Sequence, residues 1–315
     1  PNTVVVVECG SAIEMPWIDE VRGVLYAYLG GESVGPAVVD LLYGRANPCG
    51  KLAETFPLRL EDNPSYLYYL GEGDRTEYRE GIFVGYRYYD KKDMPVLFPF
   101  GHGLSYTQYE YSDLTLDKTS MKDTDTLTVT VKVKNVGDRA GKEIVQLYVS
   151  DDQSTAIRPV KELKGFDKVE LAPGQEKTVA FTLDKRAFAY YNVDINDWHV
   201  ETGSFTVMIG RSSRDIQLCA KVEVESTQQI KRTYSFNSTI GDIMADPKGA
   251  QMVGQMMQAM NPMQEAEESD ANPMGAEAMQ AMMQYMPLRG IIMFAGGAPE
   301  VAAGLQQLID ALNAQ

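Results

Sequence analysis

Carboxylates and guanidinium groups alternate in a short stretch from Glu72 to Glu80, which reads EGDRTEYRE. A carboxyl group works as a general acid when its pKa is raised toward the working pH. A nearby arginine has the opposite effect, because its positive charge stabilises the ionised form. Glu72 lies close in sequence to Arg75 and Arg79. We therefore interpret the stretch as a salt-bridged interdomain loop, with acid catalysis by Glu72 as the alternative.

The same interpretation covers Glu77 and Glu80, which flank Arg79. Planar guanidinium groups pair well with carboxylates, so these charges are expected to fix the geometry of the loop. The longer stretch from Gly71 to Tyr109 is rich in aromatic residues, arginine and glycine at once. Linkers avoid large rings and strands avoid many glycines. We expect an ordered, irregular surface that is held against another part of the protein.

Histidine and cysteine contents argue against several kinds of active site. The chain has two histidines, His102 and His199, which disfavours a histidine-based metal site or a Ser-His-Asp triad. His102 lies between two glycines and close to Phe98 and Phe100, so we expect a structural role. The three cysteines, Cys9, Cys49 and Cys219, have no metal-like spacing. We expect buried thiols in a reducing compartment, and hence a cytoplasmic protein.

Two weaker motifs have alternative interpretations. The adjacent Asp151 and Asp152 would suit calcium, but two neighbouring acids are a weak signal. The triplet Asn237-Ser238-Thr239 has the glycan acceptor pattern, which matters only in a secreted protein. We expect no metal and no cofactor.

Charge and hydropathy exclude two classes of partner. The net charge is −15, whereas nucleic-acid binding needs a basic footprint. The sequence has no apolar run long enough for a transmembrane helix. We expect neither nucleic acid nor a membrane as a partner.

The first hundred residues have the pattern of a layered α/β domain. Val4–Val7 is a run of four valines, which is typical of a parallel strand covered on both faces. A second strand is predicted over residues 23–29, and apolar spacing predicts a helix over residues 32–43. A parallel strand needs neighbours, and few are encoded downstream. We therefore expect that an N-terminal portion of the domain is missing.

The sequence pattern changes twice more. From Tyr111, apolar and polar residues alternate in about seven short segments, which predicts an antiparallel β-sandwich of the immunoglobulin or fibronectin type III kind. After Ser226, twelve of the sixteen methionines occur. Met252, Met256 and Met260 recur at helical spacing, and Met279, Met282, Met283 and Met286 do the same. An acidic segment, 261–272, separates them and is predicted to be mobile. A last helix is predicted over residues 299–314. Methionine stripes usually mark packing seams, which would suit docking on a neighbouring domain or the formation of a homodimer.

Several runs of the chain resemble glycoside hydrolase family 3 enzymes, the β-glucosidase family. In the first hundred residues the resemblance lies in PNTVVVV (1–7), Gly30-Gly31, GPAVVDLLYGRANPCGKLAETFP (35–57), NPSYLYY (63–69), REGIFVGYRYYD (79–90) and PVLFPFGHGLSY (95–106). Further runs resemble the family's fibronectin type III-like domain, NVGDRAGKEIVQLYV (135–149) and ELKGFDKVELAPGQ (162–175). MPLRGIIMFAGG (286–297) resembles, more loosely, a helical extension of some members.

The resemblance implies an α+β multi-domain fold. Residues 1–110 would be the C-terminal part of the α/β sandwich domain. Residues 111–226 would form the fibronectin type III-like β-sandwich, and residues 227–315 a methionine-rich helical extension. Trp17, Tyr66, Tyr68 and Tyr69 could then line a sugar subsite, although we favour burial of these rings at a domain interface.

The implied activity is retaining hydrolysis of β-glucosides, which needs a nucleophile and an acid/base about 5 Å apart. In the family, the nucleophilic aspartate lies in an N-terminal (β/α)₈ barrel and the acid/base glutamate in a loop well before the PNTVVVV strand. Both parts are absent from this sequence. We therefore expect no catalytic residue in this chain, no activity of the chain alone, and substrate-binding residues that the sequence does not identify. The alternatives are a non-catalytic carbohydrate-binding or interaction module and one half of a split glycosidase.

Overall fold

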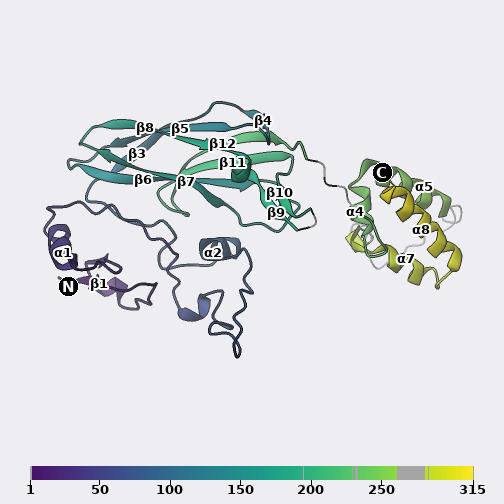
Figure 1. Cartoon of the computed structure of the whole chain (residues 1–315), viewed down its shortest axis with the longest axis horizontal. Helices are drawn as coiled ribbons and strands as arrows, with labels where there is room; N and C mark the ends of the chain where they lie inside the picture. Colours follow the sequence, from purple (N-terminus) through teal and green to yellow (C-terminus); the bar gives the residue numbers. More distant parts are fainter. Residues whose placement is uncertain are drawn as a thin grey trace, which may run out of the picture. The chain divides into compact units, whose positions relative to one another are not determined.

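The structure of this chain is a computed structural model that describes residues 2–193, 195–228, 230, 233–260, 281–282 and 284–314, without the side chains of 255–260. The chain divides into two compact units, Pro1–Gln229 and Ile230–Gln315, which are taken separately here (Figure 1). The first unit combines α/β elements with a β-sandwich, and the second is helical. The predicted α+β multi-domain fold class is confirmed.

The α/β portion begins with two parallel strands and a helix. Strand β1 (Val4–Val7) pairs in parallel with β2 (Gly23–Tyr26). The 3-10 turn η1 (Ile18–Glu20) lies between the two strands, and helix α1 (Val34–Leu42) follows β2. The helix confirms the prediction from apolar spacing. The strand predicted over residues 23–29 ends at Tyr26, because Tyr28 has a φ of 52°, which an extended strand does not allow.

The prediction that Val4–Val7 is covered on both faces is wrong for this chain. Val4 and Val6 are exposed, and β2 is the strand that pairs with β1 among the described residues. A strand in a two-stranded sheet has few neighbours to exclude water from its faces.

An irregular stretch leads from the α/β portion to the sandwich. It contains the 3-10 turn η2 (Leu60–Asp62) and the helix α2 (Tyr86–Lys91). Helix α2 starts directly after Gly85, whose φ of 55° favours glycine. A backbone bridge between Phe56 and Phe98 closes the stretch on itself.

The β-sandwich consists of two sheets. One sheet has the order β3 (Tyr109–Leu116), β5 (Leu127–Asn135), β8 (Glu176–Leu183). The other has the order β4 (Ser120–Lys122), β12 (Ile216–Glu225), β11 (Gly203–Gly210), β6 (Gly141–Asp151), β7 (Glu162–Leu171). Short helix α3 (Lys185–Phe188) precedes a hairpin of β9 (Tyr190–Asn192) and β10 (Asp197–His199). The pattern thus predicted the sandwich but missed the shortest strands.

Alternation of side chains along the strands builds the core between the two sheets. In β5, Leu127, Val129, Val131 and Val133 are fully buried, whereas the intervening threonines and lysine are not. They belong to one cluster with residues of the facing sheet such as Phe205. Burying each such side chain contributes about 1.5–3 kcal/mol to stability. The same alternation makes Cys219 on β12 exposed, so the prediction of three buried thiols is wrong for this residue, and Cys9 and Cys49 are half-buried.

The second unit contains helices α4 (Ile240–Met244), α5 (Pro247–Met260), α7 (Leu288–Phe294) and α8 (Pro299–Asn313). Helix α8 confirms the last predicted helix, with Pro299 in its first turn. Its Leu305, Leu308, Ile309 and Leu312 pack into a core with Ile243 and Leu288.

Only part of the methionine prediction falls on described residues. Met252 and Met286 pack against the edge of the helical core, whereas Met282 is exposed. The side chains of Met256 and Met260, together with Met279, Met283 and the acidic segment 261–272, lie outside the described residues.

A capping box starts helix α4 and gives a first testable prediction. The Thr239 hydroxyl accepts a hydrogen bond from the Asp242 amide at 3.0 Å, and the Asp242 carboxylate accepts one from the Thr239 amide at 3.0 Å. Replacing Thr239 by alanine is expected to cost the second unit about 1 kcal/mol, because an amide at the helix start loses its partner. Amide hydrogen exchange in α4 measures this loss. Thr239→Ser keeps the oxygen and is expected to retain most of the protection, so equal exchange in the two variants contradicts the capping role.

Candidate functional site

The segment from Tyr66 to Val84 concentrates large exposed apolar side chains. These are Tyr66, Leu67, Tyr69, Leu70, Tyr78, Ile82 and Val84, and we call the set the 66–84 apolar segment. Tyr68 is half-buried, with the Arg79 guanidinium 5.7 Å from the centre of its ring. Trp17 lies apart in the sequence and is half-buried at the start of the turn η1. Groups of exposed apolar residues in a soluble protein mark surfaces that contact a partner or ligand.

The carboxylates of the 72–80 stretch lie on the surface. A tight turn joins Glu72 and Arg75, whose backbones exchange hydrogen bonds of 2.9 and 3.1 Å. Gly71 makes the turn possible, because its φ is 70° and an added Cβ would lie 2.0 Å from the Arg75 carbonyl oxygen. Glu72, Asp74 and Glu77 are exposed and Glu80 is half-buried.

One ion pair forms within this stretch. The Arg79 Nε donates to Glu77 Oε2 at 2.7 Å, and this contact raises the pKa of Arg79 above its ordinary value. Exposed carboxylates beside arginines lack the buried, apolar environment that is typical of a general acid. Among the described residues, no group of three or more histidine, cysteine, aspartate or glutamate side chains gathers as a metal site would require.

His102 occupies a packed position. Its ring stacks on Phe98 with a centroid distance of 5.0 Å, and its carbonyl oxygen accepts a hydrogen bond from the Leu52 amide. Burial lowers the pKa of His102, and the nearby Lys51 charge lowers it further. A neutral, stacked imidazole in this position joins two distant parts of the irregular stretch.

Helix α2 is attached to the β-sandwich by a buried carboxylate. Asp90, at the end of the helix, accepts a hydrogen bond from Arg214 Nε at 2.7 Å and forms an ion pair with Lys161 Nζ at 2.9 Å. The Arg214 guanidinium also donates to the Met94 carbonyl oxygen at 2.9 Å. The Asp90 side chain is only 6% exposed. We call this set the Asp90 junction.

Aromatic packing reinforces the same attachment. Tyr86, on the first turn of α2, stacks on Phe100 at 4.8 Å and meets Tyr148 of β6 edge-on at 6.1 Å. Its hydroxyl accepts a hydrogen bond from the Leu163 amide of β7 at 2.8 Å. Burial raises the pKa of Tyr86, so the phenol stays protonated. The apolar segment therefore ends on a helix that the sandwich holds in place.

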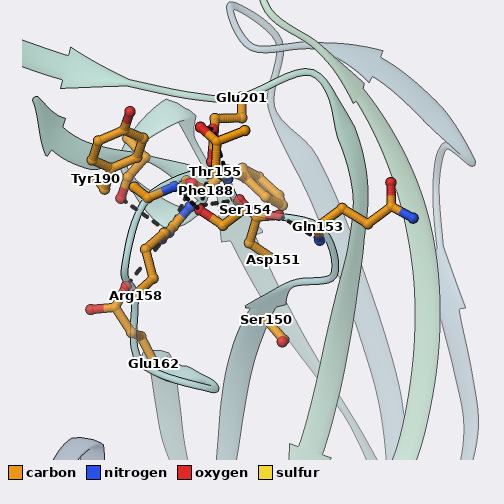
Figure 2. A network of polar contacts seen from close by, with 12 residues as sticks. Ser150, Asp151, Gln153, Ser154, Thr155, Arg158, Glu162, Phe188, Tyr190 and Glu201 are labelled. Atoms are coloured by element: carbon orange, nitrogen blue, oxygen red, sulfur yellow. Dashed lines mark hydrogen bonds and ion pairs between the residues drawn. The ribbon is translucent and has the colours of Figure 1, made fainter. Parts of the chain in front are cut away.

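A second buried charge network lies in the loop between β6 and β7 (Figure 2). The Arg158 guanidinium pairs with Asp151 at 2.9 Å and donates to the Phe188 carbonyl oxygen at 3.1 Å. Its Cζ atom lies 5.5 Å from the centre of the Tyr190 ring. Burial raises the pKa of Asp151, although the Gln153 amide and Arg158 act in the opposite direction.

Glu162 connects the two networks. It forms an ion pair with Arg87 of α2 at 3.1 Å, accepts a hydrogen bond from Lys164 at 3.2 Å, and lies 3.7 Å from Arg158. Burial lowers the pKa of Lys164, but the adjacent Glu162 carboxylate opposes this effect. Three cations around one carboxylate make Glu162 a shared contact between α2 and the loop.

Glu201 fixes the tip of the same loop. Its carboxylate accepts from the Ser154 hydroxyl at 2.6 Å and from the Thr155 amide at 3.1 Å (Figure 2). Burial acts to raise the pKa of Glu201, but these hydrogen bonds outweigh it and lower the pKa. The loop is therefore held from both sides, by Arg158 and by Glu201.

The two carboxylates that could suit calcium, Asp151 and Asp152, both have cationic partners in the structure. Asp151 pairs with Arg158, and Asp152 accepts from Lys221 at 2.9 Å and from the Thr206 hydroxyl at 2.7 Å. Asn237 of the glycan acceptor pattern is exposed, and the Thr239 hydroxyl belongs to the α4 capping box. The sequence analysis did not identify Asp90, Arg158 or Glu162. For Arg158 and Glu162, the closely spaced opposite charges in RPVKELK (158–164) were the available signal, and Asp90 lies outside this run.

Comparisons with known proteins agree with this architecture. Residues 1–106 match the glycosyl hydrolase family 3 C-terminal domain, and residues 143–213 match the fibronectin type III-like domain. The chain is 54% identical over 312 residues to thermostable beta-glucosidase B of Acetivibrio thermocellus, a match that covers 99% of this chain and 41% of that protein. It is 43% identical over 253 residues to an exo-alpha-(1->6)-L-arabinopyranosidase of Bifidobacterium longum, covering 80% of this chain and 33% of that protein.

Solved structures show the same relationship. The crystal structure of a GH3 beta-glucosidase from Bifidobacterium adolescentis matches with a TM-score of 0.72 and 41% identity, covering 79% of this chain and 37% of that one. A beta-glucosidase from Kluyveromyces marxianus in complex with glucose matches with a TM-score of 0.66 and 45% identity, covering 70% of this chain and 26% of that one. The chain thus spans about two fifths of the length of the relative that matches nearly all of it. By its two domains and these relatives, the chain belongs to glycoside hydrolase family 3 and corresponds to the C-terminal part of its members.

Proposed function

We propose that this chain is the C-terminal portion of a retaining β-glucosidase whose nucleophile and acid/base residues lie outside it. The main support is the 54% identity to a thermostable beta-glucosidase, which extends over 99% of this chain but only 41% of that protein. The substrate would be a β-glucoside or oligosaccharide. The exo-alpha-(1->6)-L-arabinopyranosidase among the relatives keeps a second glycoside class open for the sugar that is cleaved.

The role of this portion would be to support the catalytic part and to wall off the substrate pocket. Retaining hydrolysis needs two carboxyl groups about 5 Å apart, one of them with a raised pKa. The carboxylates of the 72–80 stretch are mostly exposed and lie beside arginines, which is the opposite environment. The 66–84 apolar segment, held through α2 by the Asp90 junction, is the surface we assign to contact with the (β/α)₈ barrel.

The remaining assignments are part of the same proposal. Residues 1–110, 111–226 and 227–315 are proposed as its three domains. Three free cysteines support a reducing, cytoplasmic location. The exposed Met293 and Phe294 of the helical unit support self-association as a homodimer.

None of the helices in the described part of the chain is long and apolar enough to cross a membrane. The other candidate functions are a non-catalytic carbohydrate-binding module and one half of a split glycosidase. A polar cavity in the sandwich, lined by Asp151, Asp152 and Lys221 among others, favours the first of these as an additional role.

An activity assay with a complementing chain tests the proposal. The purified chain is expected to release no 4-nitrophenol from 4-nitrophenyl β-glucoside above the buffer rate. Co-expression with the part of the Acetivibrio thermocellus relative that this chain does not match is expected to restore turnover, with that part alone as the control. Turnover by this chain alone contradicts the proposal.

A further inference from the structure

A polar cavity of about 700 Å³ opens in the sandwich at the end of strand β6. Ser150, Asp151, Asp152 and Arg158 line it from β6 and the following loop, and Ser204 and Lys221 line it from β11 and β12. Small-molecule sites in proteins occupy about 300–1,000 Å³. The cavity therefore has room for one or two sugar rings.

The walls of the cavity are held before any ligand binds. Arg158 and Asp151 form its buried side, with side chains 8% and 5% exposed. Figure 2 shows Arg158 reaching from the loop toward Asp151, while Glu201 fixes Ser154 and Thr155 at the loop tip. A site with fixed side chains loses little conformational entropy when a ligand binds.

The hydrogen-bonding capacity of the walls is only partly used. Asp152 accepts from Lys221 and Thr206, and Asp151 accepts from Arg158 and the Gln153 amide. A carboxylate can accept about four hydrogen bonds, and an ammonium group can donate three. Each carboxylate keeps spare acceptor sites, and Lys221 keeps spare donors directly beside Asp152.

The arrangement of charges selects the class of ligand. Acceptors and donors lie side by side in the lining, Asp152 next to Lys221 and Asp151 next to Arg158, and Lys91 adds a third cation. An anion would face two carboxylates, and a cation would face the positive charges of these three basic side chains. Neighbouring hydroxyl groups of a sugar both donate and accept, so they fit a carboxylate beside an ammonium group.

We propose that this cavity is a binding site for a neutral saccharide, with the Asp152–Lys221 pair recognising two adjacent hydroxyl groups. The lining residues include no aromatic ring for stacking on a sugar face. Weak binding is therefore expected, with a Kd on the order of 1 mM. The saccharide class rests on the proposed function, but binding is measured on this chain without turnover, so the two proposals can fail separately.

Titration of the full chain with cellobiose, followed by the backbone amide signals of Gln153 and Ser154, tests the site. Saturable shifts are expected in the unaltered chain, with binding at least about tenfold weaker in Asp152→Asn and in Lys221→Gln. Lys132→Gln is the matched control, since Lys132 pairs with Asp113 at 2.8 Å on the other sheet, and it is expected to bind like the parent. The Lys221 side chain is 69% exposed and the Asp152 side chain 22% exposed, so both variants are expected to fold.

Three results overturn the proposal. The first is the absence of saturable shifts with either cellobiose or glucose. The second is unchanged binding in both Asp152→Asn and Lys221→Gln. The third is displacement of the sugar by inorganic phosphate, which identifies an anion site instead.

Discussion

Replacing Arg158 by methionine is expected to lower the free energy of unfolding of the first unit by about 3–5 kcal/mol. Methionine keeps most of the apolar stem but removes the partner of Asp151, whose side chain is 5% exposed. It also leaves the carbonyl oxygen of Phe188 without a donor that now lies at 3.1 Å. An unpaired buried carboxylate costs far more than the net stabilisation of the pair, because its desolvation is no longer offset.

The loss is expected to depend on pH through Asp151. Burial already raises the pKa of this carboxyl group in the folded chain, and removing Arg158 raises it further. A carboxyl whose folded pKa is raised destabilises the fold when ionised. The variant's loss in free energy of unfolding is therefore smallest below the ordinary aspartate pKa of about 4. It grows as the pH rises through the raised pKa of Asp151 in the folded chain.

Denaturation followed by tryptophan fluorescence measures this effect, since Trp17 and Trp198 both lie in the first unit. Arg45→Met is the matched control, because Arg45 and Asp40 form an exposed pair, at 3.4 Å, and it is expected to change stability by less than about 1 kcal/mol. Adding Asp151→Asn to Arg158→Met is expected to recover part of the loss. Equal losses in the Arg158 and Arg45 variants, or a deficit that grows at low pH, contradict this account.

The Asp90 junction predicts the second large effect. Asp90→Ala removes the carboxylate that pairs with Lys161 and accepts from Arg214, and the 12% exposed Lys161 side chain is left without this partner. The expected loss is about 3 kcal/mol. Because Asp90 attaches α2 to the sandwich, amide exchange in residues 86–91 is expected to increase more than exchange in β5.

An exposed ion pair between strands β6 and β7 of the sandwich is the control for this variant. Glu170→Ala removes the partner of Lys142, which lies 3.7 Å away, and both side chains are exposed. Surface pairs of this kind contribute about 0–1 kcal/mol. If Asp90→Ala and Glu170→Ala lower stability equally, or if exchange in α2 does not change, Asp90 does not attach the helix.

Local patterns in the sequence predicted the elements that local physics determines. Alternation of valine with threonine and lysine gave β5, and helical spacing gave α1 and α8, because side-chain period depends on the backbone of each element alone. The end of β2 escaped prediction, since it depends on the left-handed backbone of Tyr28, an uncommon conformation for a tyrosine.

The long-range contacts were beyond prediction from the sequence. Asp90 meets Arg214 across 124 residues, and Ser154 meets Glu201 across 47 residues. No local pattern indicates that such residues come together, because the sandwich topology creates the contact. The charged stretch 72–80, in contrast, was recognisable from sequence as a set of carboxylates beside arginines, and the Glu77–Arg79 pair lies within it.

Covalent trapping tests most directly the claim that the nucleophile lies outside this chain. A retaining enzyme forms a covalent glycosyl intermediate on its nucleophile, which an activated 2-fluoroglucoside traps. Intact-mass measurement of the two co-expressed chains after trapping is predicted to show one added glycosyl group on the complementing portion and none on this chain. A glycosyl group attached to a carboxylate of this chain, such as Glu72 or Glu80, contradicts the account.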